Sequence, residues 1–339
     1  MPPPGNIAVT GVGLAVPGVT APADLMRPPA PSAGPVDPAE RIGRRGLRYL
    51  DRASQLALCA AHDALREAAL PTAASENEGG ASVAVVASSN LGNLDTVCTV
   101  TADIAEEGTD RISPMRLPVA SSNVVASAVA TRFSLRGPSL MLCNGPTSGL
   151  DAVHWGMSLL SANRGSQSLV VGVETSNTVV ERLLGSSGRR LFDGAVALLL
   201  EDEETARARG AEPVARLGPY RREGSLAACV HHLTGQDREA PGAAGLWLSG
   251  PAHGTGTGTG TGTGADDGAD AAGGAPALPR YDLSADHGEA SGALGVLQCA
   301  AAVGWFPSHD AGSALLTNGD GDDADAVAAM LISPVGGDR

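Results

Sequence analysis

Short and almost uninterrupted apolar runs alternate with longer alanine-rich stretches along most of this chain. A run that is apolar at every position is typical of a strand buried on both faces. In residues 50–70 the apolar side chains recur at spacings of three and four, which predicts an amphipathic helix. Alternation of buried strands with helices of this kind favours an α/β fold.

The predicted elements fall into two comparable series. Strands are expected at 7–12, 82–87, 139–143, 168–173 and 195–200, and then at 213–217, 245–248, 313–317 and 326–332. Helices are expected at 50–70, 148–163 and 289–303. The stretch 202–210 separates the two series. We therefore divide the chain into residues 1–205 and 206–339 and expect an internally duplicated architecture.

Two stretches of biased composition interrupt this pattern. Residues 21–38 are rich in proline and alanine and are expected to form a surface loop. Residues 254–274 start as Gly-Thr repeats and continue into Asp and Gly. They carry too little apolar side-chain surface to order themselves, so we expect a mobile loop.

The charge balance and the cysteines limit the partners and the compartment. With 37 acidic and 23 basic residues, the formal net charge is -14, which disfavours nucleic acid and anionic membrane surfaces as partners. No apolar run is long enough to span a bilayer, and the first residues lack the features of a signal peptide. Five scattered cysteines without metal-ligand spacing are typical of free thiols. We expect a cytoplasmic protein with no metal and no cofactor.

Several short motifs occur along this chain in the same order as in one enzyme family. They are residues 7–13, Arg111-Ile112-Ser113-Pro114, Gly137-Pro138-Ser139 with Thr147-Ser148-Gly149, Asp193-Gly194 before Glu201, His253-Gly254-Thr255, and the glycines of 288–295. As a set, they resemble the β-ketoacyl synthases, or ketosynthases. The resemblance implies a thiolase-like α/β fold, a dimer of chains whose two duplicated halves form a layered αβαβα architecture. It also implies condensation by a cysteine thiolate and two histidines.

The nucleophile position of this family is changed here. Counted from Gly137 in the family spacing, it falls on Pro146, which offers no nucleophile, acid or hydrogen-bond donor. Cys143 is expected to lie inside the preceding strand as a buried, inert thiol. His253 matches the first catalytic histidine and keeps the Gly-Thr-Gly-Thr sequence that follows it.

A carboxylate takes the place of the second histidine. The family places a glycine directly before this histidine and further glycines three and six residues after it. Gly288, Gly292 and Gly295 have this spacing around Glu289, so Glu289 occupies the histidine position. Choosing His287 instead breaks the glycine spacing. The family lysine falls on Ser284, and the acidic stretch 318–323 replaces a glycine–phenylalanine gate. We therefore expect no self-sufficient condensation, with Pro146, His253 and Glu289 as degenerate positions.

One branch of the family, the chain-length factors of type II polyketide synthases, also lacks the nucleophile, commonly with glutamine in its place. The resemblance therefore implies a non-catalytic subunit that pairs with an active ketosynthase and bounds the tunnel for the growing polyketide. By register, a helix near 94–105 contributes tunnel or interface positions at Asp95, Cys98 and Ala102. The same helix is equally compatible with an ordinary interface.

Carrier-protein docking and two other functions remain open. The net charge of -14 repels an acidic carrier, so the acyl carrier protein is expected to dock mainly on the active partner. A local basic patch or a solvated helix face is formed by Arg41, Arg44, Arg45 and Arg48. The alternative functions are a divergent acyltransferase or decarboxylase that uses His253 with Cys143 or Glu289, and a homodimeric acyl-binding scaffold.

Overall fold

The computed structural model describes residues 6–72, 82–185, 190–234, 244–251, 278, 280–310, 312–319 and 325–336. Its strands are β1 (Ile7–Ala15), β2 (Val83–Ser88), β3 (Ser139–Leu142), β4 (Gln167–Glu174), β5 (Gly194–Asp202), β6 (Ala215–Glu223), β7 (Ala244–Ser249), β8 (Arg280–Asp282), β9 (Ser313–Asn318) and β10 (Val327–Pro334).

The α-helices are α1 (Pro38–Ile42), α2 (Arg52–Glu67), α3 (Leu94–Glu107), α4 (Val124–Phe133), α5 (Ser148–Ser161), α6 (Thr178–Leu184), α7 (Glu203–Ala208), α8 (Leu226–Thr234), α9 (Leu283–His287) and α10 (Leu294–Trp305). The 3₁₀ turns are η1 (Pro22–Met26), η2 (Leu47–Tyr49), η4 (Thr109–Arg111), η5 (Pro114–Arg116), η6 (Pro118–Ala120), η7 (Gly145–Thr147), η8 (Ser291–Ala293) and η9 (Phe306–Ser308). None of the helices in these ranges is long and apolar enough to cross a membrane.

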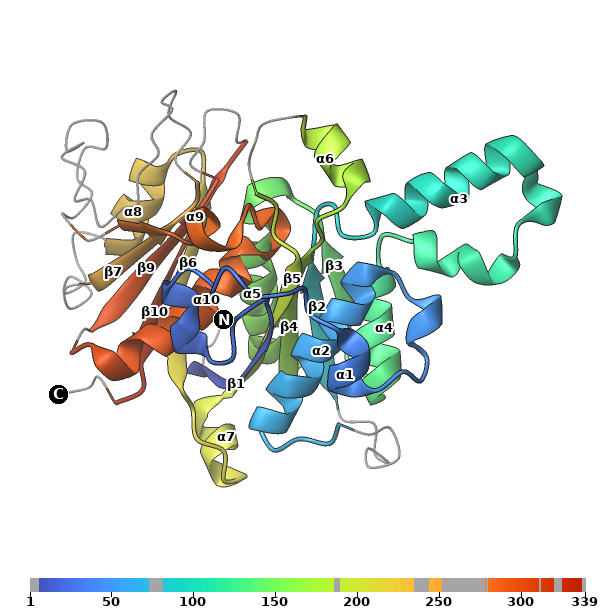
Figure 1. The fold of residues 1–339 in the computed structure, drawn as a ribbon. Coiled ribbons are helices and arrows are strands. Elements are labelled where there is room, and N and C mark those ends of the chain that lie inside the picture. Colours follow the sequence, from blue (N-terminus) through green and yellow to red (C-terminus); the bar gives the residue numbers. More distant parts are fainter. Residues whose placement is uncertain are drawn as a thin grey trace.

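The described strands form one sheet made of two matching halves (Figure 1). Their order is β3-β2-β4-β5-β1-β6-β10-β9-β7-β8. In the first half, β2 pairs in parallel with β3 and β4, and β5 pairs antiparallel with β4 and β1. In the second half β7, β8, β9, β10 and β6 repeat this pattern. The expected duplication is confirmed, and the boundary expected at 205/206 falls inside α7.

The chain packs in five layers, in which layers of helices alternate with the two halves of the sheet. The helices α2 and α4 cover one face of the first half, α5 and α10 lie between the halves, and α8 covers the outer face of the second half. Separate hydrophobic clusters fill the spaces around α5 and α10, beneath α2 and α4, and beneath α8. This is the αβαβα layering implied by the family resemblance.

Glycines and alanines allow the layers to approach closely. A Cβ on Gly11 would lie 2.3 Å from the carbonyl oxygen of Ala64, so α2 sits directly on β1. A Cβ on Gly149 would lie 2.5 Å from the backbone nitrogen of Gly295, so α5 and α10 touch through their backbones. Only 3% of the residues are aromatic, and this close packing of small residues builds the core in their place.

Most of the Pro/Ala-rich stretch 21–38 lies at the surface as expected, but the turn η1 within it is anchored to the core. Within it, Leu25 is fully buried in the central core. The Nε2 atom of His287 lies 2.9 Å from the Leu25 carbonyl oxygen, and the Tyr281 hydroxyl donates to the Met26 carbonyl at 3.1 Å. A single buried leucine and two side-chain contacts thus hold η1 against the second half of the chain.

Other expectations differ in their bounds. Each of the nine expected strands is present, but β6 extends to Glu223, and the short β8 was not expected. The helix expected at 289–303 begins only at Leu294, because the turn η8 precedes it. Helices α4 and α8 were also not expected. The Gly/Thr-rich stretch 254–274 lies outside the described residues.

An arm of residues 94–123 projects from the body of the molecule (Figure 1). It consists of α3 and the turns η4, η5 and η6, and the single buried residue of α3 is Val100. Leu117 on this arm is 52% exposed, and Leu183 and Leu184 on the neighbouring α6 are 62% and 43% exposed. The arm and α6 therefore present apolar side chains that no described part of the chain covers.

Candidate functional site

The segment between β3 and α5 forms a tight elbow that leads into a buried helix. It turns through Gly145, whose φ of 74° is a conformation that favours glycine. Pro146 follows as the second residue of η7, within the first turn, where its fixed φ suits the start of a helix. Pro146 is exposed at the tip and offers no nucleophile and no donor. The backbone of the elbow is therefore formed without a reactive side chain.

One asparagine joins the elbow to the second central helix. The Nδ2 atom of Asn90 donates to the Gly145 carbonyl and to the Ser291 hydroxyl, each at 2.8 Å. Its Oδ1 atom accepts from the Gly145 N–H at 3.2 Å and from the Ser148 hydroxyl at 3.0 Å. Ser291 belongs to η8, which follows Glu289 and leads into α10. The structure therefore brings the elbow with Pro146 close to the segment that carries Glu289.

A buried carboxylate lies beneath the same junction. Glu174, at the end of β4, is 4% exposed. It accepts hydrogen bonds from the backbone N–H groups of Asn90 (2.6 Å), Leu91 (3.1 Å) and Gly292 (3.1 Å), and from the Ser89 hydroxyl (3.1 Å). Burial raises the pKa of Glu174 to about 7, although these donors act in the opposite direction. Glu174 thus ties the base of the arm to η8.

Glu289 is held by its backbone in the loop before η8. Its N–H donates to the Arg190 carbonyl at 2.8 Å, and its carbonyl accepts from the Phe192 N–H at 3.2 Å. Gly288, directly before it, has a φ of 91°, and a Cβ there would lie 2.7 Å from the carbonyl carbon of Leu191. The fold therefore requires a glycine at 288, and this agrees with the register that places Glu289 in the histidine slot.

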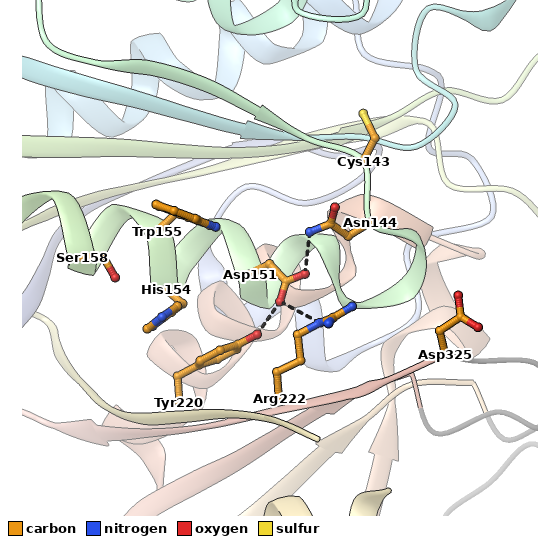
Figure 2. Close-up of a pocket in the computed structure, with 9 residues that line it drawn as sticks. All are labelled: Cys143, Asn144, Asp151, His154, Trp155, Ser158, Tyr220, Arg222 and Asp325. Atoms are coloured by element: carbon orange, nitrogen blue, oxygen red, sulfur yellow. Dashed lines mark hydrogen bonds and ion pairs between the residues drawn. The ribbon is translucent and has the colours of Figure 1, made fainter. Parts of the chain in front are cut away.

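Cys143 differs from the buried thiol that we expected. The strand β3 ends at Leu142, one residue earlier than expected, and Cys143 is exposed. Its sulfur points away from Asp151 and His154 (Figure 2). Loss of hydration and the nearby Glu174 carboxylate raise the pKa of this thiol. Cys143 is therefore accessible but lacks the lowered pKa of a catalytic thiol.

Of the two histidines considered in the sequence analysis, only His287 lies in the described part of the chain. His287 is 3% exposed, and its contact with Leu25 assigns it to the packing of η1. Burial lowers its pKa. Ser284, at the lysine position, lies in α9. His253 lies outside the described residues.

A polar hollow of about 690 Å³ lies beside the elbow (Figure 2). It is lined by Cys143, Asn144, Asp151, His154, Trp155, Ser158, Tyr220, Arg222 and Asp325. Four of these residues come from α5 at spacings of three and four, which places them along one side of the helix. Two come from β6 at a spacing of two, which places them on one face of the strand.

Asp151 is the best-connected residue of the hollow. Its carboxylate is 4% exposed and accepts hydrogen bonds from Asn144 Nδ2 (3.0 Å), Thr147 Oγ1 (2.9 Å) and the Tyr220 hydroxyl. The Nε atom of Arg222 lies 3.8 Å from the same carboxylate. Asp151 therefore joins the elbow and α5 to β6, which belongs to the other half of the chain.

Two rings form a flat wall of the hollow. The imidazole of His154 stacks on the phenol of Tyr220, with 4.3 Å between ring centroids and 14° between ring planes. Burial and the hydrogen bond to Asp151 raise the pKa of Tyr220, and burial lowers the pKa of His154. Both rings are therefore neutral near pH 7. In the described chain, no three His, Cys, Asp or Glu side chains are grouped as metal ligands.

Comparison with known proteins assigns this fold and elbow to a family. The family model for the N-terminal domain of β-ketoacyl synthases matches residues 33–201. Residues 33–201 of this chain belong to the β-ketoacyl synthase family. It is 28% identical over 286 residues to a granaticin polyketide putative β-ketoacyl synthase 1 of Streptomyces violaceoruber, covering 69% of this chain and 66% of the relative. It is 25% identical over 231 residues to a 3-oxoacyl-[acyl-carrier-protein] synthase 2 of Vibrio harveyi, covering 61% and 54%.

The fold is likewise that of solved β-ketoacyl synthases. The ishigamide ketosynthase/chain length factor gives a TM-score of 0.69 at 22% identity, covering 98% of this chain and 100% of the other. A β-ketoacyl synthase from Burkholderia phymatum gives a TM-score of 0.72 at 17% identity, covering 98% and 100%. In the sequence alignments, the chain spans 54% of the length of the Vibrio harveyi relative and 66% of the length of the Streptomyces violaceoruber relative.

The three candidate tunnel or interface positions, Asp95, Cys98 and Ala102, all lie on α3 of the arm. Cys98 and Ala102 are exposed, and Asp95 is half-buried. The Oδ1 atom of Asp95 is buried and has no hydrogen-bond partner within the described ranges. The three positions share one side of α3 because they are three and four residues apart. They remain candidate tunnel or interface positions.

The sequence analysis missed four residues that organise this β-ketoacyl synthase elbow, namely Asn90, Asp151, Glu174 and Tyr220. Two of them carried a local signal. Asp151 is an acidic residue on an otherwise apolar helix, and Glu174 ends a strand with eight buried residues. A charged residue in a buried run normally has partners. The partners themselves could not be read from the local sequence.

Proposed function

We propose that this chain is a non-catalytic, chain-length-factor-like subunit of a type II polyketide synthase. It pairs with an active ketosynthase and bounds the tunnel in which a polyketide chain grows on a carrier protein. The observation that carries the proposal is Pro146. A formed elbow, with Asn90 and Glu174 in place beneath it, has a proline where the reaction needs a thiol.

The projecting arm supports a second chain as the partner. A helix with one buried residue on an arm is poorly stabilised by its own chain. The exposed leucines of the arm and α6 provide an apolar surface of the kind that a partner covers. The strand β3 also lies at the edge of the sheet, where one row of its backbone groups has no neighbouring strand in the described chain.

Carrier docking is proposed to lie mainly on the ketosynthase partner. The net charge of -14 disfavours an acidic carrier on this subunit. The four arginines do not form one helix face, because Arg41 lies in α1 and Arg48 in η2. Arg41 is used internally, contacting the Leu14 carbonyl and the Asp63 carboxylate, each at 2.6 Å. The other three arginines are exposed and provide a smaller basic surface for a carrier.

Co-expression with a ketosynthase from the same genome tests the proposal. The expected result is a one-to-one complex in native mass spectrometry, with this chain insoluble or unstable when expressed alone. Pro146→Cys serves as a control, because it restores a thiol without changing the arm. This variant should form the same complex and gain no condensing activity. A stable homodimer that ignores every ketosynthase would reject the proposal and favour an acyl-binding scaffold in the cytoplasm.

The exposure of Cys143 keeps an independent enzyme as the second candidate. An acyltransferase would need Cys143 to react as a thiolate, with His253 or Glu289 assisting. The raised pKa of Cys143 argues against this chemistry. Alkylation at pH 7 followed by mass spectrometry distinguishes the two candidates. We expect Cys143 to react no faster than the exposed Cys98, whereas a much faster reaction at Cys143 alone would favour the enzyme.

A further inference from the structure

The hollow between α5 and β6 is not explained by the missing nucleophile. Its volume of about 690 Å³ is in the range of small-molecule sites. It combines flat side chains with polar groups that retain hydrogen-bonding capacity. No described residue hydrogen-bonds to the ring nitrogens of His154 or to the Ser158 hydroxyl. Trp155 is 49% exposed and lines the same space.

Arg222 supplies a paired set of donors. Its Nε side faces Asp151 at 3.8 Å, as Figure 2 shows, and its side chain is 45% exposed. The two Nη atoms therefore remain for another acceptor. A guanidinium fork matches a planar group that presents two oxygen atoms side by side. Carboxylates, phosphates and 1,3-dicarbonyl groups in their planar enol form have this arrangement.

Of these three groups, the charges of the hollow favour the 1,3-dicarbonyl group, which is neutral. Two carboxylates, Asp151 and Asp325, line the space with one guanidinium, so an anionic ligand meets net repulsion. Beside the Arg222 guanidinium a cation is disfavoured as well, because the two positive charges repel and the nearby Asp151 carboxylate already has three hydrogen-bond donors. The stacked rings of His154 and Tyr220 suit a flat ligand.

We propose that the hollow between α5 and β6 binds a neutral 1,3-dicarbonyl segment, with the Nη atoms of Arg222 donating to its two oxygens. The rings of Tyr220, His154 and Trp155 form the walls around the flat part of the ligand. This inference rests on the proposed function, since an unreduced polyketide chain consists of such segments. It assigns this subunit a binding role away from the positions on α3.

Two small probes test the inference on the full chain, purified alone or with its ketosynthase. Benzoylacetone carries a 1,3-dicarbonyl group, and butyrophenone has the same carbon skeleton with one ketone. Calorimetry should show benzoylacetone binding about tenfold more tightly than butyrophenone, which corresponds to the added charge-assisted hydrogen bonding. Binding should also change the fluorescence of the exposed Trp155.

Matched variants locate the site. Arg222→Leu should remove the preference for benzoylacetone. Arg221→Leu should retain it, because adjacent strand residues point to opposite faces and Arg221 does not line the hollow. Equal affinity for both probes, no binding of either probe, or a preference that survives Arg222→Leu would overturn the inference. Loss of the ketosynthase complex would instead count against the proposed function, because that readout does not depend on the probes.

Discussion

Asp151 connects three separate segments at the residue scale. Its buried carboxylate accepts from Asn144 and Thr147 of the elbow and from Tyr220 of β6. These donors lie in a largely buried place, where an unpaired polar group costs free energy. The carboxylate therefore stabilises the elbow and also holds it against the second half of the chain.

Asp151→Ala should lower the free energy of unfolding by about 3 kcal/mol, because it leaves the buried Thr147 hydroxyl and the half-buried Tyr220 hydroxyl without an acceptor. Tyr220→Phe removes one hydrogen bond and keeps the ring, so it should cost about 1 kcal/mol. Urea unfolding followed by circular dichroism measures both values. Equal losses for the two variants would contradict the central role of the carboxylate.

Glu174 gives the stability of the protein a dependence on pH. The pKa of Glu174 is about 7 in the folded chain, whereas the ordinary value for a glutamate, which applies to the unfolded chain, is 4.5. Between these values the folded state keeps a proton that the unfolded state has released. Stability should therefore fall as pH rises through this window, by at most about 1.4 kcal/mol per pH unit.

Glu174→Gln removes the titrating group and should flatten this dependence. Melting temperatures from pH 4.5 to 7 for the natural chain and the variant provide the measurement. Other titrating groups contribute equally to both proteins and cancel in the difference. Parallel curves for the two proteins would show that Glu174 stays ionised throughout the window, held by its four donors.

At the scale of elements, α3 is a long helix with little support from its own described chain, since Val100 is the one buried residue of its fourteen. One side of it carries Asp95, Cys98 and Ala102, of which the last two are small and exposed. If this side bounds a tunnel at the partner interface, the size of these residues sets the available length. Small side chains there leave more room than aromatic ones.

Cys98→Phe or Ala102→Phe should shorten the polyketide made by the reconstituted complex by at least one extension unit. Liquid chromatography with mass spectrometry of the products provides the readout. Glu107→Phe is the matched control, since Glu107 is exposed on the opposite side of α3. An unchanged product length in both tunnel variants would identify α3 as an ordinary interface helix.

The elbow shows how an element keeps its shape after its chemistry is lost. Pro146 is the second residue of η7, and its fixed φ suits the first turn of a helix, so it leaves the backbone path from β3 to α5 intact. Asn90 holds this path through the neighbouring Gly145 and Ser148, and none of its contacts needs a side chain at 146. The architecture of the elbow therefore does not depend on a nucleophile.

At the scale of the whole molecule, apolar surface gathers where the arm meets α6. Leu183 and Leu184 are exposed on α6, which contacts α3. A chain with a net charge of -14 gains solubility from its acidic surface. Large apolar side chains at one exposed place therefore indicate a covered surface in the assembled protein.

Leu183→Asp and Leu184→Asp should each weaken the complex with the ketosynthase by about tenfold or more, because a buried leucine contributes about 1.5–3 kcal/mol. Sedimentation of the purified mixture measures the dissociation constant. Tyr49→Asp is the control, as Tyr49 is equally exposed at 62% but lies on η2. A similar loss from the control would mean that surface charge, rather than this surface, governs association.

Local properties of the sequence determined the strands, the central helices and the degenerate elbow. Continuous apolar runs predicted β1, β2, β4 and β5, whose residues are almost all buried, because burial on both faces is a property of each run. The spacing of the motif glycines set the register around Glu289, and the structure shows close backbone contacts at Gly288 and Gly295. The loss of a nucleophile at Pro146 also needed only residue identity and spacing.

Tertiary structure alone decided which polar groups meet. Asn90 reaches Ser291 across 201 positions, and Tyr220 reaches Asp151 across 69. It also decided that Cys143 lies outside β3 and that the Pro/Ala-rich stretch packs through Leu25. Local patterns encode burial and backbone conformation, whereas a hydrogen bond between distant segments exists only once the layers have packed. The site therefore had to be read from the folded chain.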